Sequence, residues 1–287
     1  MGWSFNNAYA RHDIEEIDMN RGFRMIVSMT GVVAASFAAH ATLAAGGGGM
    51  SAAQVVERNV AARGGLQAWR AVNTMTLSGQ IDVGGTKPVK LQYVMTMKRP
   101  HKSRFELNFD NQIAFQVYDG SQGWKVRPFL GRNVAEPYTP AEAKSAAETA
   151  DLDGPLVDYA AKGSQVALQG METIDGHRAY KLLLTTKDHA QRHVWIDASS
   201  FLEVKVEGDP RKLDGRMHVV SVYYRDYRRE GGLMVPHLLE TQVTGVKQKH
   251  QMTIQHVTVN QPADDALFAK PQLPAQPQSA PARVAAK

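Results

Sequence analysis

The sequence predicts a mainly β protein: a strongly curved antiparallel sheet that forms an incomplete, open β-barrel, with α-helices on its concave side. Runs in which apolar and polar residues alternate follow one another between residues 75 and 259. Asp-Gly, Asp-Asn and Gly-Gly pairs, which are typical of hairpin turns, separate many of these runs. No strand-helix-strand rhythm indicates a parallel sheet. We therefore expect about eleven antiparallel strands.

The N-terminus has the features of a secretion signal. Arg21 and Arg24 precede an apolar run over residues 25–45, which ends in Ala44 and Ala45. A basic segment, an apolar stretch and small residues at its end are typical of a cleaved signal peptide. We expect cleavage near Ala44–Ala45 and export to the periplasm.

Two features of this segment leave alternatives open. The apolar run is nearly long enough to serve as an uncleaved membrane anchor. Four acidic residues precede Arg21, which is unusual for a signal, so Met19 or Met25 is a candidate start. We assign residues 1–45 to a signal peptide with an uncertain N-terminal extension.

Two helical segments are expected. Ser51, with Gln54 three residues later, begins a helix that extends to Ala71 and is interrupted at Gly64–Gly65. A second helix begins at Thr139-Pro140 and continues to about Ala150. A further turn or two is expected through Ala161.

Strand patterns occupy the sequence between these helices and after the second one. The first group covers residues 75–83, 89–98, 104–109, 113–117 and 124–126, with turns at Gly84–Gly85, Arg99–Pro100, Asp110–Asn111 and Asp119–Gly120.

The second group covers residues 166–168, 180–184, 194–196, 202–206, 217–224, 233–243 and 252–259, with turns at Asp175–Gly176, Asp214–Gly215 and Gly231–Gly232. The alternation slips at His256, which indicates a β-bulge. Residues 46–270 therefore form one β domain, and residues 271–287, rich in Pro, Ala and Gln, are predicted to be disordered.

Composition excludes several classes of function. The formal net charge is +5, but no run of Lys or Arg provides a nucleic-acid footprint. The absence of cysteine excludes disulfides, thiolate metal sites, a cysteine nucleophile and a lipid-modified N-terminal cysteine. No catalytic or phosphate-binding motif is present. We expect a monomer with no enzymatic activity, no cofactor and no metal.

Ten apolar residues in neighbouring strands share an inward-facing phase in the predicted sheet. They form either the wall of a ligand cavity or an ordinary packed core, and strand patterning alone does not separate the two. These residues are Met75, Leu77, Leu91, Tyr93, Met95, Met97, Phe105, Leu107, Phe115 and Val117.

A series of short motifs, in order and spacing, resembles the outer-membrane lipoprotein-sorting proteins, relatives of the periplasmic lipoprotein carrier. The resemblance covers roughly residues 51–270. The motifs are Val56-Glu57-Arg58-Asn59 with Gly64-Gly65 and Trp69, Tyr118-Asp119-Gly120 with Trp124, Gly176-His177, Ala179-Tyr180-Lys181-Leu182, Val194-Trp195-Ile196-Asp197, Glu203-Val204-Lys205, Asp226-Tyr227-Arg228 and Gly232-Leu233-Met234-Val235-Pro236.

This resemblance implies an incomplete barrel, capped by helices, whose apolar cavity holds acyl chains. The expected function is that of a periplasmic carrier or chaperone. It would bind a lipid, or the acyl chains of a lipoprotein, and pass it toward the outer membrane, with transfer partners at the inner and outer membranes. The helical segment at residues 140–161 would act as a lid. The alternatives are an envelope-stress sensor or regulatory binding module on the same fold, and an enzyme with an unrecognised site.

Overall fold

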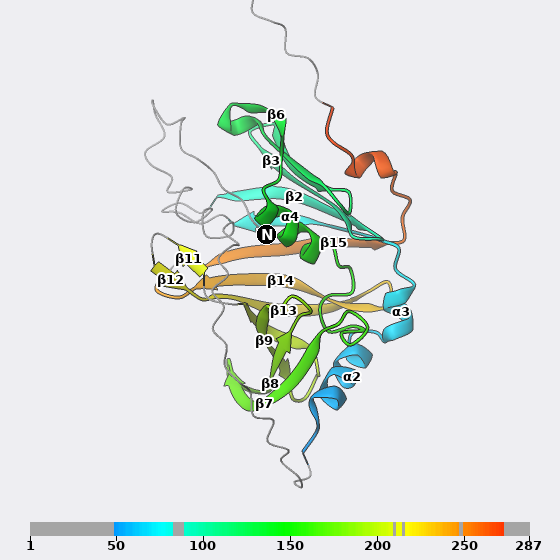
Figure 1. Cartoon of the computed structure of the whole chain (residues 1–287), viewed down its shortest axis with the longest axis vertical. Helices are drawn as coiled ribbons and strands as arrows, with labels where there is room; N and C mark the ends of the chain where they lie inside the picture. Colours follow the sequence, from blue (N-terminus) through cyan, green and yellow to red (C-terminus); the bar gives the residue numbers. More distant parts are fainter. Residues whose placement is uncertain (1–48, 83–88, 209–210, 214–215, 247–248, 273–287) are drawn as a thin grey trace, which may run out of the picture.

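The computed structural model describes residues 49–82, 89–208, 211–213, 216–246 and 249–272. These residues form one antiparallel sheet of 13 strands in the order β6-β5-β4-β3-β2-β1-β15-β14-β13-β10-β9-β8-β7 (Figure 1). The edge strands β6 and β7 lie at opposite ends of this order. The sheet is an open barrel, and the predicted fold class is confirmed.

The strands of the first half follow each other in space as they do in sequence. Their bounds are β1 Thr74–Asp82, β2 Lys90–Lys98, β3 Lys102–Phe109, β4 Gln112–Tyr118, β5 Gly123–Arg127 and β6 Arg132–Pro137.

The second half begins at the far edge of the sheet and returns to β1. Its strands are β7 Gln165–Ile174, β8 His177–Thr185, β9 Gln191–Asp197, β10 Glu203–Gly208, β13 Val220–Glu230, β14 Leu233–Val243 and β15 His250–Val259. Strands β11 Arg211–Leu213 and β12 Arg216–His218 form a separate two-stranded ribbon.

Helices α2 (Ala52–Ala62) and α3 (Leu66–Arg70) precede the sheet, and α4 (Pro140–Thr149) connects its two halves. Ser51 and Gln54 form a capping box at the start of α2, as do Thr139 and Glu142 at the start of α4. Short 3₁₀ helices η1 (Pro128–Leu130) and η2 (Asp265–Phe268) complete the elements of the described residues. The predicted helices and the break at Gly64–Gly65 are confirmed.

The turn chemistry sets the register of the hairpins. Asp110 and Asn111 both have positive φ, 47° and 60°, in the two-residue loop between β3 and β4. Asp175 and Gly176, in the loop between β7 and β8, also have positive φ, 49° and 86°. Both turns confirm the prediction from sequence.

The predicted bulge near His256 is also confirmed. Ser78 of β1 pairs with His256, but the next residue, Gly79, pairs with Ile254. The extra residue is therefore on β15, and it re-aims the remainder of that strand.

The number of strands is larger than the sequence indicated. In the part of the chain that the structure describes, the predicted total of about eleven is replaced by 13 strands in the main sheet and two in the ribbon. Strand β6 was missed because Arg132–Pro137 has no regular alternation and contains a proline.

Several predictions fall on residues outside the described ranges. They are the signal peptide over residues 1–45, the turns at Gly84–Gly85 and Asp214–Gly215, and the disordered tail beyond residue 272. Among the described residues, no helix has the length and apolar character needed to cross a bilayer.

Candidate functional site: an apolar concave face under a helical strap

One face of strands β1 to β3 is almost wholly apolar. Its register places Met75 opposite Met97, Leu77 opposite Met95, and Tyr93 opposite Leu107. We call this the concave face, because α4 and the segment after it cover it. It contains eight of the predicted residues in one cluster: Met75, Leu77, Leu91, Tyr93, Met95, Met97, Phe105 and Leu107.

Phe115 and Val117 do not lie on this face, and their predicted orientation is wrong. Phe115 pairs with Glu106 and Val117 pairs with Arg104, so both point to the opposite side of the sheet. There the Arg104 guanidinium lies 4.7 Å from the centre of the Phe115 ring. Helix η2, whose Phe268 is fully buried, packs against β3 and β4.

The cause of this error is the parity of the β3–β4 hairpin. A two-residue loop at Asp110–Asn111 pairs Phe109 with Gln112, so odd positions of β3 face even positions of β4. The inward residue opposite Leu107 is therefore Ala114. Ile113, Phe115 and Val117 are more apolar than their inward neighbours, which misled the interpretation of β4.

Other residues complete the apolar cluster of the concave face, and the sequence reasoning did not select them. Leu233, Val235 and Ile254 alternate clearly within their strands, but only the sheet order places β15 beside β1 and β14 next to β15. Further members are Trp69, Val72, Ile81, Ala114, Leu152 and Val157. A second cluster, formed by Val55, Val56, Leu156, Leu182, Leu184, Val194 and Ile196, joins α2 to the other half of the sheet.

The cover of the concave face has an unusual composition. We call residues 139–163, which comprise α4 and the turns after it, the strap. Helix α4 has the sequence PAEAKSAAET, which contains no large apolar side chain. It therefore offers little apolar surface with which to adhere to the face beneath it.

Ion pairs attach α4 to both halves of the sheet. Glu142 pairs with Lys125 of β5, and Glu148 pairs with Arg192 of β9 at 2.5 Å. Lys144 pairs with Asp188 in the turn between β8 and β9. The strap thus bridges the open barrel through charged contacts.

The carboxylates in these contacts favour their ionised forms. Burial alone would raise the pKa of Glu142, but hydrogen bonds from Lys125 and Thr139 outweigh burial and lower it. The hydrogen bond from Lys144, with a second from Thr186, lowers the pKa of Asp188 to about 2. The attachments therefore persist at neutral pH.

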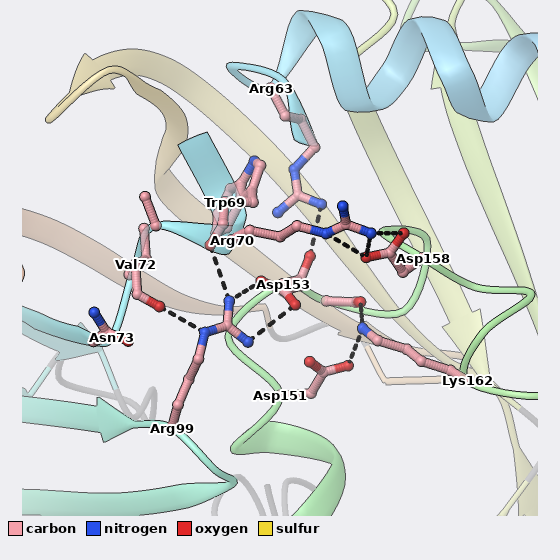
Figure 2. Close-up of polar contacts among 12 residues, drawn as sticks. Arg63, Trp69, Arg70, Val72, Asn73, Arg99, Asp151, Asp153, Asp158 and Lys162 are labelled. Carbon is pink, nitrogen blue, oxygen red and sulfur yellow. Dashed lines mark hydrogen bonds and ion pairs between the residues drawn. The ribbon is translucent and has the colours of Figure 1, made fainter. Parts of the chain in front are cut away.

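A second polar network fastens the C-terminal part of the strap (Figure 2). The Arg99 guanidinium pairs with the carboxylate of Asp153 and also donates to the carbonyl oxygens of Val72 (2.6 Å) and Trp69 (2.9 Å). Arg63 donates to the Asp153 carbonyl oxygen at 3.1 Å. The strap is thereby connected to α3 and to the β2–β3 turn.

Two more contacts reinforce this network. Arg70 of α3 makes a bidentate pair with Asp158, with distances of 2.9 to 3.1 Å. Lys162 bonds to the Asp151 carboxylate at 2.6 Å and to the Gly154 carbonyl oxygen at 2.8 Å, which closes the strap on itself.

A small pocket adjoins this network. It has a volume of about 100 Å³ and is lined by Arg99, Pro100, His101, Ala150, Asp151 and Leu152. Binding sites for drug-sized ligands have volumes of about 300 Å³ or more. This pocket is too small for an acyl chain.

The described residues offer no obvious site for a metal ion, because no three His, Asp or Glu side chains gather there. The perturbed carboxylates lie in ion pairs and turns. Asp119, for example, accepts hydrogen bonds from the backbone of Ser121 and Gln122. This arrangement is that of a tight turn at the Tyr118-Asp119-Gly120 motif.

Comparison with solved structures gives the class of fold. A LolA superfamily protein from Nitrosomonas europaea superposes with a TM-score of 0.52 at 14% identity, covering 77% of this chain and 99% of that one. A DUF1329 family protein from Desulfovibrio piger gives a TM-score of 0.54 at 13% identity, covering 76% and 97%.

A third similar structure is a putative outer membrane lipoprotein-sorting protein domain from Vibrio parahaemolyticus. Its TM-score is 0.51 at 11% identity, covering 76% of this chain and 96% of that domain. No protein-family model and no curated protein sequence matches the chain. The chain therefore has the fold of the LolA superfamily and of lipoprotein-sorting domains, as its motifs indicated.

Proposed function

We propose that this protein is a periplasmic carrier that binds a lipid, or the acyl chains of a lipoprotein, on the concave face of its sheet. The observation that carries the proposal is the combination of a broad apolar face with a covering helix, α4, that has no large apolar side chain and is attached by charged groups. A face that served only as a core would be better stabilised by an apolar cover. The fold shared with a lipoprotein-sorting domain supports the same function.

The energies involved favour exchange of the strap for a ligand. Each buried methylene contributes about 0.8 kcal/mol, so a dozen methylenes contribute about 10 kcal/mol. An ion pair open to solvent contributes at most about 1 kcal/mol. The Lys144–Asp188 pair, whose side chains are 48% and 45% exposed, belongs to this weak class. Burial of an acyl chain can therefore outweigh release of α4 from its ion pairs, and it would also replace the apolar contacts that Leu152, Leu156 and Val157 of the strap make.

The proposed mechanism is passive. The strap moves away, acyl chains enter against the concave face, and membrane-bound partners supply and receive the cargo. The protein performs no covalent step, and the volume available under the strap selects among acyl chains. Transfer runs toward the outer membrane, and the carrier works as a monomer.

Native mass spectrometry of the full chain, expressed with export in a bacterial host and purified without detergent, tests this proposal. A bound lipid or acylated peptide is the expected result. A fluorescent fatty acid should also be taken up with saturation. A ligand-free protein that fails to take up the probe would contradict the carrier function. Capture of a non-acylated peptide by that protein would favour a regulatory binding module.

A further inference from the structure

The Tyr93 hydroxyl lies among apolar side chains in the middle of the concave face. Tyr93 is 2% exposed, and its hydroxyl has no hydrogen-bond partner among the residues that the structure describes. Its direct cross-strand neighbours are Gly79 on β1 and Leu107 on β3. Neither has a side-chain group that could accept a hydrogen bond.

The diagonal neighbours of Tyr93 on β1 and β3 are equally apolar. They are Leu77, Ile81, Phe105 and Phe109. The ring of Tyr93 stacks on that of Phe105, with centroids 5.8 Å apart and planes at 19°. Phenylalanine would make the same apolar contacts without the cost of burying a hydroxyl.

Two other tyrosines in the described sheet have hydrogen-bond partners. Tyr118 donates to the Gly120 carbonyl oxygen at 3.0 Å, and Tyr227 donates to the Glu203 carbonyl oxygen at 3.0 Å. Buried tyrosine hydroxyls usually find such partners. The unpaired hydroxyl of Tyr93 therefore points to a partner that arrives with the ligand.

The surroundings define the chemistry of that partner. Burial raises the pKa of Tyr93 well above its ordinary value, so the hydroxyl stays protonated and available as a donor. Its direct and diagonal neighbours on β1 and β3 include no cationic side chain. A charged acceptor would be costly there, which leaves a neutral one. In a glycerolipid, the neutral acceptor next to the first methylenes of an acyl chain is an ester carbonyl.

We propose that the Tyr93 hydroxyl donates a hydrogen bond to an acyl-ester carbonyl of the bound lipid, which makes Tyr93 a specificity residue for ester-linked chains. This inference rests on the proposed carrier function and adds the class of ligand. Phospholipids and the diacylglyceryl group of lipoproteins share this ester. An ether-linked lipid of equal length lacks the carbonyl and leaves the hydroxyl unpaired.

The test compares ester and ether lipids on the full chain and its Tyr93→Phe variant. Isothermal titration calorimetry uses a short-chain diacyl phosphatidylcholine, its diether analogue and a synthetic diacylglyceryl lipopeptide. The wild type should bind the diester about three- to tenfold more tightly than the diether, which corresponds to one hydrogen bond. In Tyr93→Phe this preference should disappear, through weaker ester binding and unchanged ether binding.

Thermal unfolding without ligand provides a second readout. Tyr93→Phe should melt at the same or a higher temperature than the wild type, because it removes a buried, unpaired hydroxyl. Tyr118→Phe is the matched control. It loses a hydrogen bond made within the protein, so it should melt at a lower temperature and keep the ester preference.

The outcomes separate this inference from the carrier function. Equal binding of diester and diether by the wild type, or equal loss of both in Tyr93→Phe, would overturn the role of Tyr93 and leave the carrier intact. A lower melting temperature for ligand-free Tyr93→Phe would also overturn it. Failure of every lipid to bind would remove both proposals. An ester preference in the phosphatidylcholine pair supports the inference, and the tighter binder of the diester phospholipid and the lipopeptide identifies the source of the ester.

Discussion

At the scale of single residues, Gly79 shows how the bulge and the concave face depend on each other. A Cβ at this position would lie 1.9 Å from the Thr253 carbonyl oxygen, a backbone atom of the adjoining β15. Strand β15 cannot move away from β1 without disturbing the pairing that places Ile254 in the apolar cluster. Only glycine allows β1 and β15 to approach this closely.

We therefore predict that Gly79→Ala lowers the free energy of unfolding by about 3 kcal/mol, because the strands must separate to admit a methyl group. Urea denaturation followed by circular dichroism measures this change. Ser78→Ala, one residue earlier, is the control and should stay close to the wild type. A Gly79→Ala protein of unchanged stability would mean that the bulge adapts freely.

At the scale of elements, helix α4 is the part of the strap that is attached chiefly by ion pairs, whereas the turns after it also bury Leu152, Leu156 and Val157. Its Lys125–Glu142 pair is the most enclosed of the three that hold α4, with side chains 9% and 12% exposed. Loss of one partner from such a pair leaves a charge without compensation. This pair should therefore control how readily the strap departs.

Lys125→Met is expected to weaken strap closure by about 2 kcal/mol, since Glu142 loses its cation in a partly dry position. Hydrogen exchange measured by mass spectrometry should then show faster exchange at residues 140–163 than elsewhere, and acyl-probe uptake should become faster. Arg228→Met, which removes an exposed pair with Asp226, is the control and should change neither rate. Uniform acceleration across the whole sheet would instead indicate global destabilisation.

The same contacts predict a response to acid. The pKa values of Glu142 and Asp188 are lowered in the folded protein, so their contribution is complete above the ordinary values of 4.5 and 3.8. It is lost as pH falls through the lowered values, which for Asp188 means about 2. The rate of amide hydrogen exchange in the strap, corrected for intrinsic rates, should be constant from about pH 7 to 5 and rise below about pH 4. A rise already between pH 7 and 5 would contradict these assignments.

At the scale of the whole molecule, one continuous sheet joins two apolar clusters. The first surrounds Leu107, and the second surrounds Leu182 beneath α2. The strap contributes to both, through Leu152 and Val157 in the first and Leu156 in the second. The two halves should therefore fold as one cooperative unit.

Leu107→Ala and Leu182→Ala test this unity, because both side chains are 0% exposed. Each should lower stability by about 3 kcal/mol. Each should also shift a single unfolding transition, seen identically by tryptophan fluorescence and by far-ultraviolet circular dichroism. Two separate transitions, with each variant moving only one, would show that the halves are independent domains.

Much of the fold could be predicted because its signals are local. The caps at Ser51 and Thr139, the turns at Asp110–Asn111 and Asp175–Gly176, and the slip at His256 depend on neighbouring residues and were confirmed. The predicted orientation of Phe115 and Val117 was wrong. The two-residue turn before them already determines which residues of β4 face inward, because it pairs Phe109 with Gln112. Hairpin register must therefore be traced from the loop, and strand composition alone is not sufficient.

The sequence by itself determined the antiparallel class, the helices and eight of the ten residues predicted for the apolar face, because period-two alternation and turn chemistry act over a few residues. Only the tertiary structure decided that β15 and β14 extend this face, that α4 crosses it, and that Lys125 and Arg192 hold α4 from opposite halves of the sheet. The physical reason is chain distance. Lys125 and Arg192 are far apart in the sequence, and the curvature of the sheet places both beside α4. The Tyr93 hydroxyl can be identified as unpaired only when the positions of all its neighbours are known.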